Sequence, residues 1–147
     1  MSLGRSGDQA GLPYSVDGIY VFGHIEPVDL VSVYKCLCDL TRLRILHLLG
    51  RRPLCVCLIQ DILREPQVKI SKHLRYLRDH GMVVAERRAN WIIYRLPDSP
   101  NPVLVENLRC LQDLLREQTV FRVDLERLEK IDASELCGPK AMKESQG

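Results

Sequence analysis

The chain has 147 residues, of which 46% are hydrophobic and 27% are charged, and its formal net charge at pH 7 is +2. This length and hydrophobic content predict one domain that buries its own core without disulfides. The sequence shows no signal peptide and no apolar run of transmembrane length, so we expect a cytoplasmic protein without a membrane partner. Because the net charge is nearly neutral, any case for nucleic-acid binding depends on where the charges lie.

The N-terminal part is predicted to contain an extension over residues 1–25, followed by two helices. Within the extension, a short strand is expected at residues 18–23. The first helix begins at Pro27, since proline suits the first turn of a helix. The second helix follows Asp39, whose side chain can cap a helix, and it ends at Gly50.

Two further helices and a hairpin are predicted in the middle of the chain. A third, short helix is expected from about Leu54 to Leu63, before Glu65–Pro66 breaks it. A fourth is expected from Gln67 to Gly81, with one apolar face and an opposite polar face. Two β-rich runs, residues 82–88 and 91–96, surround a short turn and predict a β-hairpin.

The C-terminal part is predicted to form a long helix, a shorter one and a tail. Asn101–Pro102 opens a fifth helix. Its leucines recur at the spacing of a helix that packs along another helix: Leu104, Leu108, Leu111 and Leu115. A shorter amphipathic stretch follows, and the last dozen residues are expected to be a disordered tail. We therefore predict one domain over residues 26–118 and a C-terminal segment over residues 119–147.

Basic residues gather in the fourth helix and the hairpin. Residues 67–95 contain seven basic and two acidic side chains, whereas residues 106–135 contain five basic and eight acidic ones. The order of elements predicts a mainly helical protein with a small β-hairpin, a winged helix-turn-helix in the order α-α-α-α-β-β-α. The residues expected to contact double-stranded DNA are Ser71, Lys72, His73, Arg75, Tyr76 and Arg78 in the helix, and Arg87, Arg88 and Asn90 at the hairpin tip.

The chain contains six cysteines, and reduced cytosolic thiols favour ligands, redox groups or core residues over a disulfide framework. Cys55 and Cys57 stand at the predicted start of the third helix, where the helix dipole and the neighbouring Arg51 and Arg52 should favour thiolate. Two thiolates with one residue between them can hold one soft metal or metalloid ion. An ideal helix would point them apart, so joint coordination should require its first turn to distort.

Three stretches of the sequence resemble the ArsR/SmtB family of metal-sensing repressors. They are residues 38–46 (CDLTRLRIL), residues 54–57 (LCVC) and residues 70–74 (ISKHL). The similarity covers roughly residues 28–118, and the LCVC run is its most specific part. The resemblance implies a homodimer joined by the first and fifth helices. It also implies a repressor that binds an inverted-repeat operator when metal-free and releases it when an ion binds.

The resemblance also shows where this chain departs from the arsenic-responsive members. In those members a third cysteine follows the pair, three residues after the second, and here that position is Gln60. Cys55 and Cys57 are therefore the expected ligands, and coordination by two thiolates is one alternative. The other alternative is a third donor among the remaining cysteines: Cys36, Cys38, Cys110 and Cys137.

The residue types around the pair favour a soft ion. The predicted fifth helix contains no histidine, which disfavours a zinc or cobalt site on it, and the four histidines form no ligand pair at helical spacing. Thiols without imidazoles favour arsenite or antimonite as the inducer, with cadmium or lead next. No organic cofactor is expected.

Three other functions remain as alternatives. Cysteines on separate helices, such as Cys38 or Cys55 with Cys110, could form a disulfide or polysulfide and make the protein a redox or persulfide sensor of the same fold. An enzyme of disulfide exchange or arsenate reduction is disfavoured, since the sequence offers no anion-binding loop and no nearby general base. The third alternative is a DNA-binding module without any sensing function.

Overall fold

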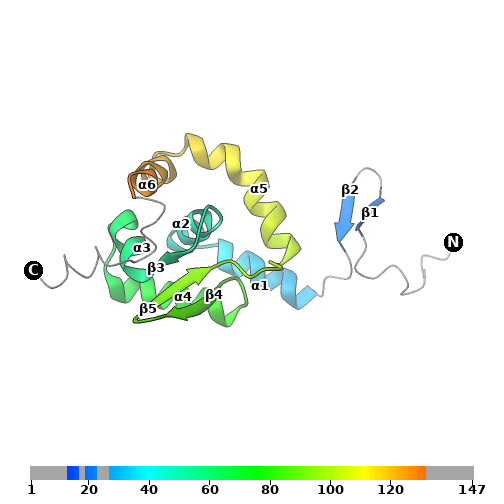
Figure 1. Ribbon diagram of the computed structural model, residues 1–147. Coiled ribbons are helices and arrows are strands. Elements are labelled where there is room, and N and C mark those ends of the chain that lie inside the picture. The colour runs from blue at the N-terminus through cyan, green and yellow to red at the C-terminus, as the bar shows by residue number, and fades with distance from the viewer. Residues whose placement is uncertain (1–12, 17–18, 23–26, 132–147) are drawn as a thin grey trace, which may run out of the picture.

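The computed structural model describes residues 13–16, 19–22 and 27–131, and side chains from residue 30 onward. Figure 1 shows a mainly helical protein with one small sheet among its helices. The helices are α1 (Pro27–Leu37), α2 (Leu40–Leu49), α3 (Val56–Leu63), α4 (Gln67–Asp79), α5 (Pro102–Glu117) and α6 (Thr119–Glu129). The strands are β1 (Pro13–Val16), β2 (Ile19–Phe22), β3 (Leu54–Cys55), β4 (Val84–Arg88) and β5 (Trp91–Arg95). In the described part of the chain, none of the helices has the length and apolar character needed to span a bilayer.

Most of the predicted elements are confirmed. β2 is the strand expected within residues 18–23, and it pairs with β1, which was not predicted, in an antiparallel hairpin. α1 to α5 occupy the five predicted helical segments, and β4 and β5 form the predicted second hairpin. The shorter amphipathic stretch is α6. The predicted tail, the last dozen residues, lies outside the described residues.

The sheet corrects the predicted start of the third helix. Leu54 and Cys55 were expected to be helical, but both are extended and pair with Tyr94 and Ile93 of β5. The sheet therefore has three antiparallel strands in the order β3–β5–β4. Both residues of β3 are buried, which explains why pairing with β5 prevails over one more turn of helix.

The helix ends lie close to where the local sequence places them. Asp39 caps α2, its Oδ1 accepting a hydrogen bond from the backbone N–H of Arg42 at 2.9 Å. Asn101 caps α5 in the same way, accepting from the N–H of Val103 at 2.9 Å. Gly81 follows α4 with a φ of +73°, a left-handed conformation that ends helices and that glycine adopts freely.

The core lies between α2, α3 and α4, and α5 and α6 cover it from one side (Figure 1). Its fully buried side chains include Ile45, Leu46, Leu48, Ile59, Ile62, Ile70, Leu74 and Leu77. α4 contributes three of these from one face, so its opposite face is turned outward. The packing of α4 therefore decides which of its side chains a partner can reach.

α6 is tied to the helices beneath it by buried polar contacts. Asp124 on α6 is 1% exposed, and its carboxylate accepts from Arg44 Nε at 2.7 Å and from Arg44 Nη2 at 2.8 Å. Arg44 Nη2 also donates to the backbone carbonyl of Leu63 at 3.0 Å, at the end of α3. Arg127 on α6 donates to the carbonyl of Ile62 at 2.7 Å. α6 thus holds the C-terminal end of α3, just before the turn into α4.

Candidate DNA-binding surface and cysteine site

The outward face of α4 carries the polar residues that the sequence singles out. Ile70, Leu74 and Leu77 are buried against the core, and the exposed side chains stand on the other side of the helix. Four of the six residues predicted to contact DNA from this helix are exposed: Ser71, Lys72, Arg75 and Arg78. Arg75 is 78% exposed, with only a long contact of 4.0 Å from its Nε to Asp79 Oδ2. The predicted basic face of this helix is therefore accessible.

His73 and Tyr76, the other two, lie half-buried on the side of α4 that faces α2. His73 Nδ1 is 3.7 Å from Asp39 Oδ1, and burial lowers the pKa of His73, which keeps its ring neutral at pH 7. Arg42 places its guanidinium 4.3 Å from the centre of the Tyr76 ring. Their contacts with DNA stay a prediction.

The β4–β5 hairpin presents its basic tip to solvent. Arg87, Arg88 and Asn90 are exposed, and Ala89 between them adopts a φ of +53° that closes the turn. Arg88 Nη2 lies 3.3 Å from Glu86 Oε2, a surface pair that leaves most of the arginine in water. A winged helix uses this hairpin to reach DNA beside the recognition helix, and contact of this tip with DNA stays a prediction.

Two exposed residues at the start of α4 were missed by the sequence interpretation. Gln67 and Val68 are both exposed, and Val68 precedes Ser71, Lys72 and Arg75 by three, four and seven residues. That spacing puts Val68 on the same face as the predicted DNA contacts. The spacing was visible in the sequence, but the interpretation considered only the polar and basic side chains of this face.

The cysteine pair lies where β3 passes into α3. Cys55 is the second residue of β3 and the N-cap of α3, with φ −84° and ψ 165°, and Cys57 is in the first turn of the helix. Their Sγ atoms are 2.7 Å apart. The sulfurs meet because Cys55 is extended, so the predicted need to distort a helical turn is wrong. The prediction assumed that both residues are helical.

The surroundings of the pair differ from those predicted for a thiolate. Cys55 is 2% exposed and Cys57 is half-buried, and burial raises the pKa of the Cys57 thiol more than nearby backbone N–H groups lower it. Arg52 Nη2 donates to the carbonyls of Leu128 and Ile131 at 3.3 and 3.2 Å. The predicted stabilisation of thiolate at this position is therefore wrong for Cys57. Cys57 is a free thiol in this structure, whereas Cys55 is disulfide-bonded, so binding of an ion by both sulfurs requires the reduced protein.

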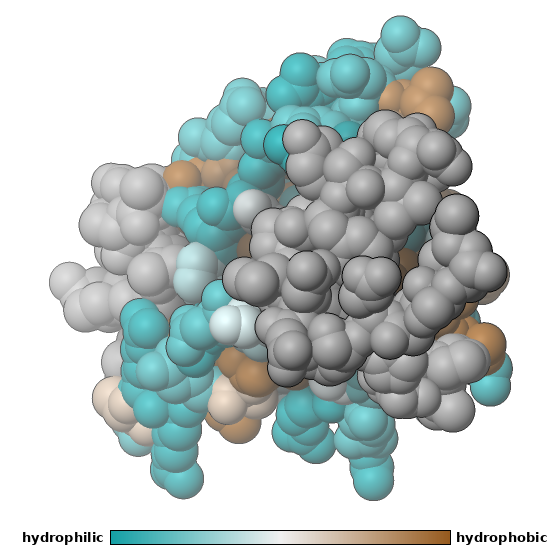
Figure 2. All heavy atoms as spheres, turned by 90° about the vertical axis from the view of Figure 1, so that its right-hand side faces the viewer, coloured by the Kyte–Doolittle hydropathy of each residue, from teal (hydrophilic) through white to brown (hydrophobic). Residues whose placement is uncertain are grey.

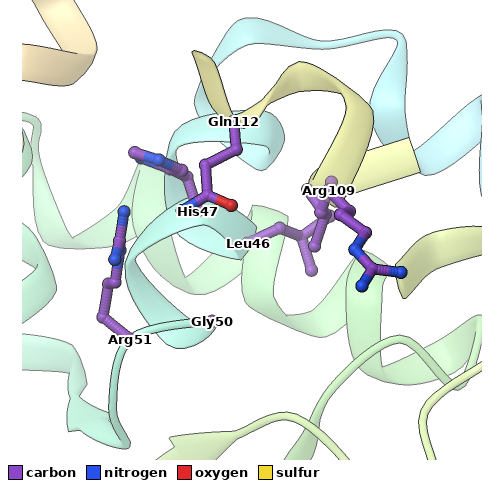
Figure 3. A pocket seen from close by; sticks show the side chains of 7 residues that line it. Leu46, His47, Gly50, Arg51, Arg109 and Gln112 are labelled. Carbon is purple, nitrogen blue, oxygen red and sulfur yellow. The ribbon is translucent and has the colours of Figure 1, made fainter. Parts of the chain in front are cut away.

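A cavity of about 160 Å³ lies between α2 and α5, and its lining residues are not among those predicted to bind DNA or an ion. Figure 3 shows Arg51 extending toward His47, while the Arg109 guanidinium points away from it. His47 is 7% exposed, and neither ring nitrogen has a hydrogen-bond partner among the described residues. Burial lowers the pKa of His47, which keeps this ring neutral.

Comparison with known proteins places the chain in a family. The family model for the bacterial regulatory protein, arsR family, matches residues 39–84. The arsenical resistance operon repressor of Escherichia coli is 36% identical over 88 residues, which cover 56% of this chain and 75% of that repressor. The chain belongs to the arsR family.

Two further proteins are similar to this chain over different shares of their own length. The arsenic resistance transcriptional regulator ArsR1 of Pseudomonas putida is 44% identical over 81 residues, 53% of this chain but only 63% of that regulator. The chain thus matches less than two thirds of the length of that relative. The crystal structure of the AntR antimony-specific transcriptional repressor has 31% identity and a TM-score of 0.53, covering 63% of this chain and 85% of that one. This likeness confirms the winged helix-turn-helix fold.

The resemblance to arsenic-responsive members would place a third cysteine three residues after Cys57, where this chain has Gln60. Gln60, at the position of the expected third cysteine, lies half-buried on α3. Cys36 is buried in the core, whereas Cys38 and Cys110 are exposed on the surface. Within the ranges that the structure describes, no three cysteine, histidine or acidic side chains gather in a group able to hold a metal. Cys137 lies outside those ranges, and its role as a third donor stays a prediction.

Proposed function

We propose that this arsR-family protein is a transcriptional repressor that binds double-stranded operator DNA through α4 and the β4–β5 hairpin. The observation that carries the proposal is the exposed basic face of α4 next to an exposed basic hairpin tip. A helix of this kind enters the major groove, where base edges differ, and the hairpin reaches the flanking backbone. Relatives named as arsenic resistance regulators and repressors support the same role.

The active form is proposed to be a homodimer joined through α1 and α5. Both helices leave large apolar side chains in solvent: Leu30, Val31 and Tyr34 on α1 and Val105 and Leu114 on α5. Figure 2 views the molecule from the right-hand side of Figure 1, and the coloured part of that face is mostly hydrophilic with small hydrophobic patches. A dimer that covers such side chains would present two α4 helices to the two halves of a symmetric operator.

The inducer is proposed to be trivalent arsenic or antimony, held by Cys55 and Cys57. The pair brings two sulfurs together without histidine ligands, a donor set suited to soft ions. The arsenic- and antimony-related names of the relatives agree with this choice. No organic cofactor is included in the proposal.

An ion bound by both sulfurs would join two elements that DNA binding uses. Cys55 belongs to β3, which pairs with hairpin strand β5 at Ile93, and Cys57 belongs to α3, which packs against α4. A shift of either sulfur would therefore move the hairpin or α4 relative to the rest of the domain. A coupling free energy of about 1–3 kcal/mol between the two sites is ordinary for such a switch.

The test is fluorescence anisotropy of the reduced protein on DNA from upstream of its own gene, titrated separately with arsenite, antimonite, zinc and cadmium. Release by arsenite or antimonite, with little response to zinc, supports the proposal. A second series, after removal of reductant, uses polysulfide. Release by polysulfide alone would replace the proposal with the redox alternative and direct attention to Cys38 and Cys110.

Replacing Arg75 by alanine is expected to weaken operator binding by about 1–3 kcal/mol, because a base or phosphate contact from the centre of the groove helix is lost. Arg122→Ala is the matched control, since Arg122 is an exposed helical arginine on α6 that pairs with Glu126 at 3.1 Å. Anisotropy measures both affinities. Equal affinities for the two variants would show that α4 does not lie in the groove.

The variants Arg87→Gln and Arg88→Gln at the hairpin tip are expected to flatten the salt dependence of binding. Each phosphate contact releases condensed counterions and contributes about −0.9 to the slope of log K against log salt concentration. Loss of one contact should therefore make the slope less steep by about 0.9. Affinities measured between 50 and 300 mM salt, roughly the useful range, test this. An unchanged slope would show that the hairpin arginines do not contact the DNA phosphates.

A further inference from the structure

Val68 is the most exposed large hydrophobic side chain in the described part of the chain. Its side chain is 79% exposed, compared with 60% for Leu114, the next in order. It stands in the first turn of α4, where valine gives no advantage to the helix, because β-branched residues form helices less readily than alanine does. Neither core packing nor helix propensity explains a valine at this position.

The neighbours of Val68 indicate what covers it. Ser71 and Lys72 follow at the i+3 and i+4 positions and are exposed on the same face. The exposed apolar side chains of α1 and α5 belong to helices outside the proposed DNA contact, although Val31 and Val105 also have a basic residue at the i+4 position, Lys35 and Arg109. An apolar side chain set among basic and hydroxyl groups is complementary to a major groove, which presents one apolar group, the C5-methyl of thymine, among polar base edges.

We propose that Val68 contacts a thymine methyl group in each half of the operator and so contributes to its sequence specificity. This inference rests on the proposed DNA binding by α4 and deepens it. N-terminal residues of a recognition helix are the ones that meet base edges, and Val68 is the second residue of α4. Direct contact between the valine methyl groups and a thymine methyl buries apolar surface that is otherwise in water.

The experiment replaces thymine by uracil at each position of the footprinted operator, a change that removes only the methyl group. For the unmodified protein, removing the methyl group at one position in each half-site should weaken binding about fourfold, the factor that corresponds to one buried methylene. Val68→Ala should bind the thymine operator about fourfold more weakly per half-site. The same variant should no longer distinguish thymine from uracil at that position.

Two controls separate the possible failures. Lys72→Ala should weaken binding to every operator and keep the uracil effect, since it removes a charge and no apolar contact. Thermal unfolding of Val68→Ala should show a melting temperature no lower than that of the unmodified protein, because alanine is the better helix former. If the unmodified protein binds no operator, the proposed function fails. Suppose instead that the unmodified protein binds, but that uracil weakens binding at no position or weakens the binding of Val68→Ala just as much. The proposal for Val68 is then overturned, and DNA binding stands.

Discussion

Cys57→Ser is expected to bind operator DNA with normal affinity and to lose release by arsenite. In the unmodified protein a coupling of about 1–3 kcal/mol corresponds to a change in DNA affinity of roughly 5- to 150-fold on saturation with the ion. Serine keeps the size of the side chain but replaces the soft sulfur donor with a hard oxygen. The ratio of DNA affinities without and with arsenite should therefore fall to about one.

Cys57 is the better of the two positions for this test. Cys55 is 2% exposed, so Cys55→Ser also buries a hydroxyl group and is expected to cost about 1–3 kcal/mol of stability if that group finds no partner. Cys57 is half-buried, and its replacement should leave the melting temperature close to normal.

Cys38→Ser and Cys110→Ser are the controls, because both cysteines are exposed, Cys38 between α1 and α2 and Cys110 on α5. Both variants should release DNA with arsenite as the unmodified protein does. Continued release in Cys57→Ser, combined with loss of release in Cys38→Ser or Cys110→Ser, would move the ion site away from the pair. Anisotropy in reducing buffer supplies all of these affinities.

Asp124→Ala is expected to lower the free energy of unfolding by about 3–5 kcal/mol, the range for breaking a buried ion pair by removing one partner. Asp124 accepts two hydrogen bonds from Arg44, which is itself only 7% exposed. Without the carboxylate, the guanidinium keeps the carbonyl of Leu63 and a contact of 3.9 Å with Glu65, but its charge is poorly compensated. Urea unfolding at one fixed protein concentration measures the change.

Glu126→Ala is the control for Asp124→Ala. Glu126 lies on the same helix and pairs with Arg122 at 3.1 Å, but its side chain is 54% exposed, so its loss should cost no more than about 1 kcal/mol. A double variant, Arg44→Met with Asp124→Leu, removes both charges and should recover much of the stability. Equal effects of Asp124→Ala and Glu126→Ala would show that the buried pair does not hold α6 in place.

The sequence alone determined the features that depend on neighbours within a few residues. The apolar spacing of Ile70, Leu74 and Leu77 predicts which face of α4 is buried, and hence that Arg75 is exposed. Asp39 predicts the start of α2 because its cap contact reaches only three residues along the chain. The family resemblance came from the same kind of short local pattern, and the comparisons confirm it.

Only the tertiary structure decided the features that depend on distant partners. Cys55 is extended because it pairs with Ile93 on β5, 38 positions along the chain, and this pairing brings its sulfur to Cys57. Arg44 is buried because Asp124, 80 residues away, neutralises it. Neither effect is visible in a local pattern, since the free energy of a strand residue or a buried charge depends on the surface that packs against it.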